Sequence, residues 1–280
     1  MRSIDVAKVT DAVEQLCMEA NYYLNEDVRE ALVRAQEVEE SETGKSVLKS
    51  LVANARIASE ERLAICQDTG MAILFVEIGQ SVHIQGGGLT EAINEGVRRG
   101  YKNGYLRCSV VGDPLLRKNT GDNTPAVIHY NLVEGDSLKI EIAPKGFGSE
   151  NMSALKMLKP SDGEEGVKRF ILDTVSQAGP NPCPPIVVGV GIGGSMEMCA
   201  LLAKKALLRP IGSRNPAEHL SRLEEELLAD INKLGIGPAG LGGRVTALGL
   251  QIESYPTHIA GLPVAVNISC HVTRHRSVYL

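Results

Sequence analysis

Apolar residues recur at helical spacing along the N-terminal part of the chain. From residue 6 to about residue 23, apolar side chains return every three or four positions and so form one stripe of a helix. Two more helices are expected over about residues 26–40 and 45–61, because acidic residues stand at or just before their starts and favour a helix N-terminus. The chain is therefore expected to begin with helices.

A different pattern follows, with short apolar runs and alternation. The run MAILFVEIG (residues 71–79) predicts a strand, and GGGLTEAINEGVRRGYKNG (86–104) predicts a glycine-rich loop with Thr90 near the start of a helix. The segment AVIHYNLVEGDSLKIEIAPKG (126–146) alternates on both sides of the turn EGDS. That alternation predicts a β-hairpin.

The C-terminal half mixes helical and strand patterns. Helices are expected around Ala154, Ile171, Leu201 and Leu223, a strand follows PNPCPPI, and the segment from residue 244 to residue 275 reads as strands joined by proline and glycine turns. The predicted fold class is α/β, of the α+β type, with mixed or antiparallel sheets surrounded by many helices. Because no repeat or low-complexity linker interrupts the pattern, residues 1–280 are expected to form a single domain.

Composition narrows the classes of function. The 280 residues are 43% hydrophobic, enough for a sizeable core, and the net charge of -5 arises from acids and bases mixed along the chain. The sequence has no basic patch of the kind that would indicate nucleic-acid binding. The N-terminus lacks the apolar stretch of a signal peptide, and no apolar run approaches the roughly 18 residues of a membrane span. A cytoplasmic protein that acts on small molecules or binds protein partners is expected.

The glycines of IVVGVGIGGSMEMCALLAKKAL fit the dinucleotide-binding pattern G-x-G-x-x-G at Gly189, Gly191 and Gly194. A nucleotide site of that type also needs a second parallel strand that ends in an acidic residue about 20 positions further on. Residues 209–216 read RPIGSRNP and provide neither. A turn that lets strand and helix pack closely, with the helix N-terminus available to an anion, is the preferred interpretation. An NAD-dependent oxidoreductase stays as an alternative.

Five of the six cysteines divide into two groups by their local setting. A disulfide framework is not expected in a cytoplasmic protein, and no CxxC pair supports a zinc ribbon or a redox site. Cys17 and Cys199 lie in helical patterns and are expected to be buried. Cys66, Cys183 and Cys270 lie at loops or strand ends, in ICQDTG, PNPCPPI and NISCHVTRH.

Thiolates from three such loops could converge in the folded chain. They would suit zinc, copper(I) or an iron–sulfur cluster, and three cysteines would leave one iron of a 4Fe–4S cluster open. An open iron is a Lewis acid that can assist the loss of hydroxide from a substrate. This chemistry suggests a dehydratase.

These motifs, with LRCSVV, RKNTGDNTPA, APKGFGSENMS and YPTHIAGLPVAVNISCHVTRH, extend over nearly the whole chain. Together they resemble the iron–sulfur hydro-lyase family that includes class I fumarase and L-tartrate dehydratase, in its alpha subunit or equivalent N-terminal domain. The resemblance implies an oxygen-sensitive 4Fe–4S cluster with one open iron. Its ligands by motif are Cys66, Cys183 and Cys270.

The resemblance also implies residues that contact the substrate. Gln67 and Asp68 belong to the motif of the first ligand, and Asp68 is the expected catalytic residue, able to accept a proton or a hydroxyl hydrogen bond. The alternative for Asp68 is an Asx turn with Thr69 and Gly70. Arg107 matches the carboxylate-binding arginine of the family, for which its bidentate fork is suited; a plain surface arginine is the alternative.

Two further substrate contacts follow from the resemblance. Gly148 lies in KGFGSEN, whose glycines would let backbone N–H groups approach an anion, although Phe147 stands where a third glycine is expected. His258 lies twelve residues before Cys270, as the substrate-contacting histidine of the family does. A lone histidine is otherwise an ordinary surface residue.

The family assigns the proton-abstracting residue and further basic contacts to a C-terminal domain, and no such domain follows Leu280. A separate beta subunit and an alpha2-beta2 assembly are therefore expected. The expected reaction is the reversible hydration of fumarate, a dicarboxylate, to L-malate. L-tartrate dehydratase is the first alternative, and a nonenzymatic iron–sulfur subunit is an alternative of another class.

Overall fold

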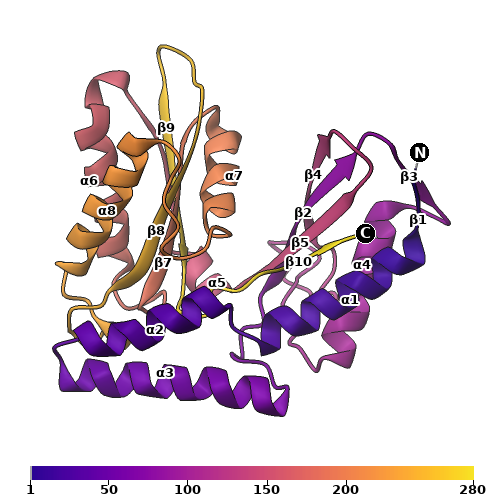
Figure 1. Ribbon diagram of the computed structural model, residues 1–280, viewed down its shortest axis with the longest axis horizontal. Helices are drawn as coiled ribbons and strands as arrows, with labels where there is room; N and C mark the ends of the chain where they lie inside the picture. Colours follow the sequence, from indigo (N-terminus) through magenta and orange to yellow (C-terminus); the bar gives the residue numbers. More distant parts are fainter. Residues whose placement is uncertain (1) are drawn as a thin grey trace. The chain divides into compact units, whose positions relative to one another are not determined.

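The computed structural model describes residues 2–280, which form two compact units (Figure 1). Unit 1 is made of the described part of Met1–Leu24, with Arg56–Phe147 and Arg274–Leu280, and unit 2 is made of Asn25–Ala55 and Gly148–Thr273. The chain thus passes through unit 1 three times and through unit 2 twice. The expectation of a single domain over residues 1–280 stays a prediction.

Unit 1 is a layer of helices on a mixed sheet. Its elements are β1 (Arg2–Asp5), α1 (Val6–Tyr22), β2 (Met71–Gly79), β3 (Val82–Gln85), α4 (Leu89–Asn103), β4 (Val127–Val133), β5 (Leu138–Lys145) and β10 (Arg276–Tyr279). The main sheet has the strand order β10-β5-β2-β4, and β1 pairs with β3 in a separate parallel ribbon. The apolar sides of α1 and α4 share one core with this sheet.

The strand β2 is confirmed over the residues predicted, but the hairpin predicted for residues 126–146 is wrong. β4 and β5 do not pair with each other; β2 lies between them, parallel to β4 and antiparallel to β5. Ala72, Leu74 and Val76 of β2 are almost completely buried, so this apolar strand takes the position where both of its edges are paired. Alternation indicates which residues form strands and does not choose the neighbour of each strand.

The helices α1 and α4 pack closely because two glycines face α1. A Cβ atom at Gly96 would lie 2.6 Å from Cβ of Val13, and one at Gly100 would lie 2.6 Å from Cβ of Cys17. The α4 residue Tyr101 is completely buried. The close approach of the helices therefore fixes the position of the Tyr101 side chain, which reaches the loop before β2.

Unit 2 is a sheet with helices on both faces. Its elements are α2 (Glu26–Val38), the first part of α3 (Glu42–Glu61), β6 (Ala154–Leu158), α6 (Gly163–Ala178), β7 (Ile186–Gly193), α7 (Met196–Ala206), α8 (Glu218–Asn232), β8 (Ala247–Tyr255) and β9 (Leu262–Ser269), with the short 3-10 helices Pro160–Asp162 and Pro238–Gly240. A four-residue helix, α5 (Phe147–Glu150), crosses the boundary between the units. The sheet has the strand order β6-β9-β7-β8.

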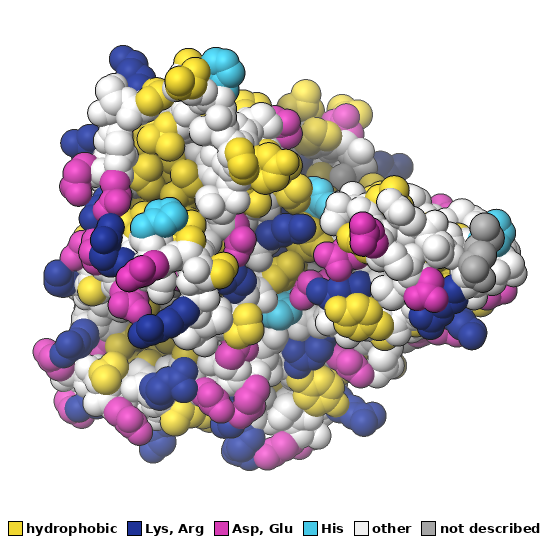
Figure 2. Space-filling view, turned by 45° about the horizontal axis from the view of Figure 1, so that its top comes forward, with side chains coloured by type: hydrophobic (Ala, Val, Ile, Leu, Met, Phe, Trp, Pro, Cys, Tyr) yellow, Lys and Arg dark blue, Asp and Glu magenta, His cyan; other side chains and the backbone are white. Residues whose placement is uncertain are grey.

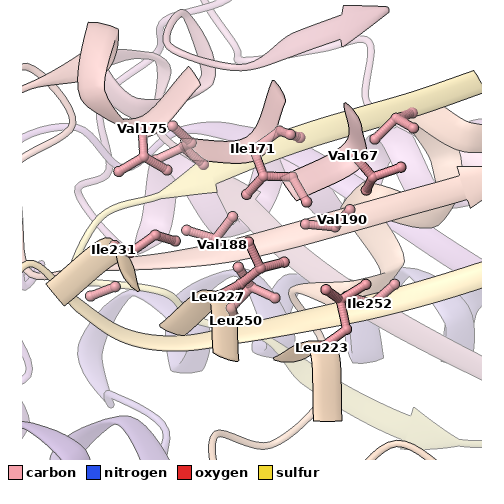
Figure 3. Packing of buried hydrophobic residues seen from close by; sticks show 14 of the residues in the cluster. Val167, Ile171, Val175, Val188, Val190, Leu223, Leu227, Ile231, Leu250 and Ile252 are labelled. Atoms are coloured by element: carbon pink, nitrogen blue, oxygen red, sulfur yellow. The ribbon is translucent and has the colours of Figure 1, made fainter. Parts of the chain in front are cut away.

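The main core of unit 2 lies between the sheet and the helices α6 and α8 (Figure 3). Apolar side chains from α6 and α8 point toward those of β7 and β8, and α7 covers the other face of the sheet (Figure 1). The labelled members are Val167, Ile171, Val175, Val188, Val190, Leu223, Leu227, Ile231, Leu250 and Ile252. This packing confirms the apolar periodicity of the predicted helices around Ile171 and Leu223.

The helix predicted around Ala154 is wrong. The segment forms β6, which pairs with β9 in the antiparallel direction, and no helix. The residues of ALKML are good helix formers, but pairing with the edge of the sheet outweighs a weak local propensity. The predicted fold class, with mixed sheets and many helices, is confirmed.

The glycine motif before α7 serves close packing. A Cβ atom at Gly189 would lie 2.1 Å from the carbonyl oxygen of Ala203, and one at Gly191 would lie 2.0 Å from that of Cys199. Residues 209–216 contain no strand, as predicted, and the parallel partner of β7 is β8, which comes after α8. The close packing of strand and helix is therefore confirmed, and the availability of the helix N-terminus to an anion stays a prediction.

The surface described shows no large patch of one charge on its visible face. Lys and Arg side chains alternate there with Asp and Glu (Figure 2). Within residues 2–280, no helix combines the length and the apolar character needed to cross a lipid bilayer.

Candidate functional site

The loop between α3 and β2 carries ICQDTG and is fixed by hydrogen bonds from elsewhere in unit 1. The Thr69 hydroxyl accepts from the backbone N–H of Arg107 at 2.9 Å and donates to its carbonyl oxygen at 3.2 Å. The Tyr101 hydroxyl lies 2.9 Å from the carbonyl oxygen of Thr69 and 3.0 Å from that of Gly70, and donates to them. The loop is held at its C-terminal end by α4 and by the segment after it.

The carboxylate of Asp68 is held by two backbone N–H groups. Its Oδ1 accepts the backbone N–H of Gly70 at 3.0 Å, and its Oδ2 accepts that of Phe147 at 2.9 Å. The Asx turn considered for Asp68 is therefore present. A Cβ atom at Gly146 would lie 3.0 Å from Oδ2 of Asp68, so this glycine of the KGFG segment makes room for the carboxylate.

Cys66 differs in setting from the buried cysteines. Its half-buried sulfur accepts the backbone N–H of Asp68 at 3.4 Å. Burial raises the pKa of Cys17, with a smaller contribution from Glu14, and burial likewise raises the pKa of Cys199. Both of these thiols are fully buried, as the sequence predicted, and are poor metal ligands in the protonated form.

Two arginines of unit 1 lie beside the same loop. Arg107 is exposed, and its guanidinium forms no ion pair with any residue of 2–280, so it is accessible to a carboxylate. Arg274 is only 5% exposed, and its Nη2 donates to the carbonyl oxygen of Asp68 at 2.7 Å. Sequence reasoning missed Arg274. It lies in the NISCHVTRH motif, four residues after a predicted ligand, but the motif gives no sign of its burial.

The predicted ligands of unit 2 lie at one end of its sheet. Cys183 comes three residues before β7 begins, and Cys270 comes directly after β9 ends. Because β7 and β9 are antiparallel, with Val187 opposite Ser269, these two positions are at the same end. His271 strengthens the arrangement, since its Nδ1 lies 3.0 Å from the carbonyl oxygen of Cys183.

Cys183 is exposed and has an unusual backbone conformation. Its φ angle of 56° lies in the left-handed region, which costs a non-glycine residue about 1–3 kcal/mol. Its backbone N–H donates to the carbonyl oxygen of Pro180 at 3.1 Å, and the carbonyl oxygen of Pro184 accepts from Ala239 at 2.8 Å. Backbone hydrogen bonds thus hold the proline-rich loop on both sides of Cys183.

His258 lies at the other end of the unit 2 sheet. It is exposed in the turn between β8 and β9, where its Nδ1 accepts the backbone N–H of Ala260 at 3.2 Å. The eight residues of β9 separate this turn from Cys270. At about 3.3 Å per residue, they span roughly 26 Å. Unit 2 therefore does not bring His258 to Cys183 and Cys270.

Gly148 lies in α5 with open space around its Cα, and no steric demand requires a glycine there. A partly buried network holds the residues after it. Lys204 of α7 pairs with Glu150 at 2.6 Å, and the amide nitrogen of Asn267 donates to Glu150 at 2.8 Å and to Ser153 at 2.9 Å. Asn267 lies in β9, so this network ties the Gly148 segment to the strand that ends before Cys270.

The three predicted cluster ligands are distributed over both units. Cys66 belongs to unit 1, and Cys183 and Cys270 belong to unit 2. Within residues 2–280, no group of three or more His, Cys, Asp and Glu side chains is arranged around a common metal position. The complete ligand set stays a prediction.

The chain has extensive similarity to known proteins. The family described as fumarate hydratase (fumerase) matches residues 10–279. A Methanocaldococcus jannaschii protein, provisionally named L(+)-tartrate dehydratase subunit alpha, is 48% identical over 274 residues, which cover 95% of each chain. The L(+)-tartrate dehydratase subunit alpha of Escherichia coli strain UTI89 is 35% identical over 272 residues, which cover 96% of this chain and 89% of that protein. The protein of the same name from Escherichia coli strain K12 is 34% identical over the same length.

Proposed function

The chain belongs to the fumarate hydratase family of hydro-lyases, and on this premise we propose that it is the alpha subunit of an L-tartrate dehydratase. The observation that supports L-tartrate as the substrate is the similarity, over almost the whole chain, to proteins named for that activity. Sequence reasoning placed fumarate first and L-tartrate second, and the relatives favour the second. Hydration of fumarate to L-malate remains the other candidate, because the family description names it.

In this proposal, Cys66, Cys183 and Cys270 hold a 4Fe–4S cluster. The amide donated to the Cys66 sulfur and the shared sheet end of the other two cysteines fit that role. When bound, such a cluster with one open iron supplies a Lewis acid that polarises a substrate hydroxyl. Cys17 and Cys199 are excluded as ligands by complete burial.

The residues of unit 1 bind and orient the substrate. The exposed Gln67 side chain donates a hydrogen bond to one substrate carboxylate. The guanidinium of Arg107 donates to both oxygens of the other carboxylate. Asp68 uses one lone pair of each oxygen for a backbone N–H, and a carboxylate has about four such sites. Its remaining lone pairs can accept the proton of a substrate hydroxyl. The turn therefore orients Asp68 and leaves it able to act.

The two substrate contacts predicted in unit 2 are the Gly148 segment and His258. The Gly148 segment offers backbone N–H groups to a carboxylate. His258 lies roughly 26 Å from the sheet end that carries Cys183 and Cys270, since β9 spans that length. If His258 contacts substrate, it therefore does so in the site of a second alpha subunit. This requirement agrees with the proposed alpha2-beta2 assembly, in which a beta subunit supplies the proton-abstracting residue.

The proposed activity is tested with the chain and its beta subunit after anaerobic reconstitution with iron and sulfide. We expect oxaloacetate from L-tartrate at a rate well above the hydration of fumarate. Cys183→Ser should lose activity and iron, and Cys199→Ser should keep both. Normal activity in Cys183→Ser, or no turnover of L-tartrate by the loaded complex, would contradict the proposal.

The place of His258 is tested by mixing two inactive chains. Alpha subunits with His258→Asn and alpha subunits with Cys183→Ser should be inactive alone. If His258 acts in the site of a second subunit, mixed assemblies contain one site with both native residues and regain part of the activity. The same two substitutions in one chain, mixed with a Cys183→Ser chain, provide the control without restoration. Absence of restoration in the first mixture would place His258 outside the shared site.

A further inference from the structure

Arg274 is a buried cation without a counter-ion. It is 5% exposed, and its Nε is buried and has no hydrogen-bond partner. Its Nη2 donates to the carbonyl oxygen of Asp68, which carries no net charge. No carboxylate within residues 2–280 forms an ion pair with it. A guanidinium has five donors and cannot give up its charge, so its burial here lacks the compensation of a direct ion pair.

Two partly buried cations of unit 2 form ion pairs with carboxylates. Arg209 contacts the buried Glu224 at 2.6 Å, and Lys204 contacts Glu150 at 2.6 Å. Arg274 differs from both. A buried charge without an ion pair is costly, and an anion bound beside it would remove that cost.

The loop that Arg274 contacts carries a candidate for this anion. The backbone of Asp68 accepts from Arg274 through its carbonyl oxygen and donates to the Cys66 sulfur through its N–H, at 3.4 Å. The guanidinium therefore contacts the residue two positions after Cys66, whose N–H donates to the Cys66 sulfur. A cluster held by thiolates brings negative charge to this position, and charges next to such a group tune its retention.

We propose that Arg274 is a positioning residue that supplies the buried counter-charge for the thiolate-bound group at Cys66. The inference rests on the proposed function, since it requires a cluster at Cys66. It gives Arg274 opposite effects in the two states of the protein. Without the cluster, the guanidinium is an unpaired buried charge; with the cluster, it attracts the bound group.

The test compares Arg274→Met with the native chain, each in complex with the beta subunit, both free of cluster and loaded. Methionine keeps the length of the side chain and removes the charge. The cluster-free variant should unfold at the same temperature as the native complex or at a higher one. The loaded variant should lose iron to a chelator about 10 to 100 times faster, which is the size of the affinity loss when an outer partner of a metal site is removed.

Two further variants separate charge from structure. Arg274→Lys keeps the positive charge and should lose iron at a rate between the other two. Arg209→Met removes a partly buried arginine that has a carboxylate partner and leaves Glu224 without its ion pair. This variant should lower the unfolding temperature without changing iron loss.

A lower unfolding temperature of cluster-free Arg274→Met, together with iron loss at the native rate, would make Arg274 a structural residue and overturn the inference. Native complex that takes up no cluster would overturn both this inference and the proposed function. If the native complex and the Arg274→Met complex both take up iron and hold it equally well, the inference alone is overturned.

Discussion

At the scale of single residues, Asp68 shows that a structural role and a chemical role can coexist. Both of its oxygens accept backbone N–H groups, from Gly70 and Phe147, which fixes the carboxylate in one orientation. A fixed carboxylate loses little conformational freedom when a substrate binds, and pre-organisation of this kind is what a reacting group requires. The Asx turn thus supports the proposed chemistry of Asp68.

Replacement of Asp68 by asparagine should separate the two roles. The amide keeps one acceptor but turns an NH2 group toward a backbone N–H, and it cannot take a proton. Turnover should fall by roughly 10²-fold or more while iron content persists. Iron per chain and kcat are the measurements. Asp113 also caps two backbone N–H groups, so Asp113→Asn is the matched control and should keep turnover. Unchanged turnover in Asp68→Asn would restrict Asp68 to the turn.

At the scale of elements, glycines decide how closely α7 approaches β7. A Cβ atom at Gly191 would lie 2.0 Å from the carbonyl oxygen of Cys199, which is far inside contact distance. Gly191→Ala must therefore push the helix from the strand, and the free energy of unfolding should fall by about 3 kcal/mol or more. Urea unfolding measures it. A Cβ atom at Gly112 would have no neighbour closer than 3.7 Å. Gly112→Ala should therefore change the free energy of unfolding by less than about 0.5 kcal/mol.

A second link between elements is the carboxylate of Glu39, which joins the end of α2 to the segment before β8. Glu39 is 2% exposed, and its oxygens accept the backbone N–H groups of Glu40, Ser41, Arg244 and Val245 at 2.8–2.9 Å. Burial alone would raise the pKa of Glu39, but these donors outweigh it and hold the pKa below its ordinary value of 4.5. The ionised carboxylate is thus favoured in the folded state.

This pKa shift predicts a pH-dependent stability. A lowered folded pKa contributes stability that is complete above pH 4.5 and is lost as the pH falls through the lower folded value. Glu39→Gln should reduce the free energy of unfolding by roughly 2 kcal/mol at pH 7, because one acceptor becomes a donor against an N–H. The difference from the native chain should shrink below about pH 4.5. Urea titrations at both pH values test this, and a constant difference would contradict it.

At the scale of the whole molecule, the relatives named subunit alpha indicate that this chain works with another subunit. The described residues supply an exposed arginine and a fixed carboxylate, and a dicarboxylate substrate needs positive groups at both of its ends. Catalysis requires all groups together, and a misplacement of about 1 Å can cost roughly 10²-fold. The isolated chain should therefore be nearly inactive.

That prediction is measured by anaerobic reconstitution of the alpha chain with and without the beta subunit. L-tartrate dehydration and the lifetime of the cluster in air are both followed, and the isolated chain should also lose iron faster. Full turnover by the alpha chain alone would place the proton-abstracting base within these residues and would remove the need for a divided site.

The sequence by itself determined most of the local structure of this protein and the grouping of its cysteines. The apolar period placed α1 and β2 at nearly their observed bounds, and the helical settings of Cys17 and Cys199 identified buried thiols. Its motifs identified the family that the chain matches. These conclusions succeed because periodicity, propensity and motif chemistry act between neighbours in the chain.

Only the tertiary structure decided which strands pair and which charges are buried. It placed β2 between β4 and β5, turned the segment around Ala154 into an edge strand, set His258 at the far end of the sheet from Cys270, and buried Arg274 without a counter-ion. Each of these outcomes depends on contacts between residues distant in sequence. The same local pattern permits several such pairings, and the choice among them comes from the burial of apolar surface and the cost of unpaired polar groups in the whole fold.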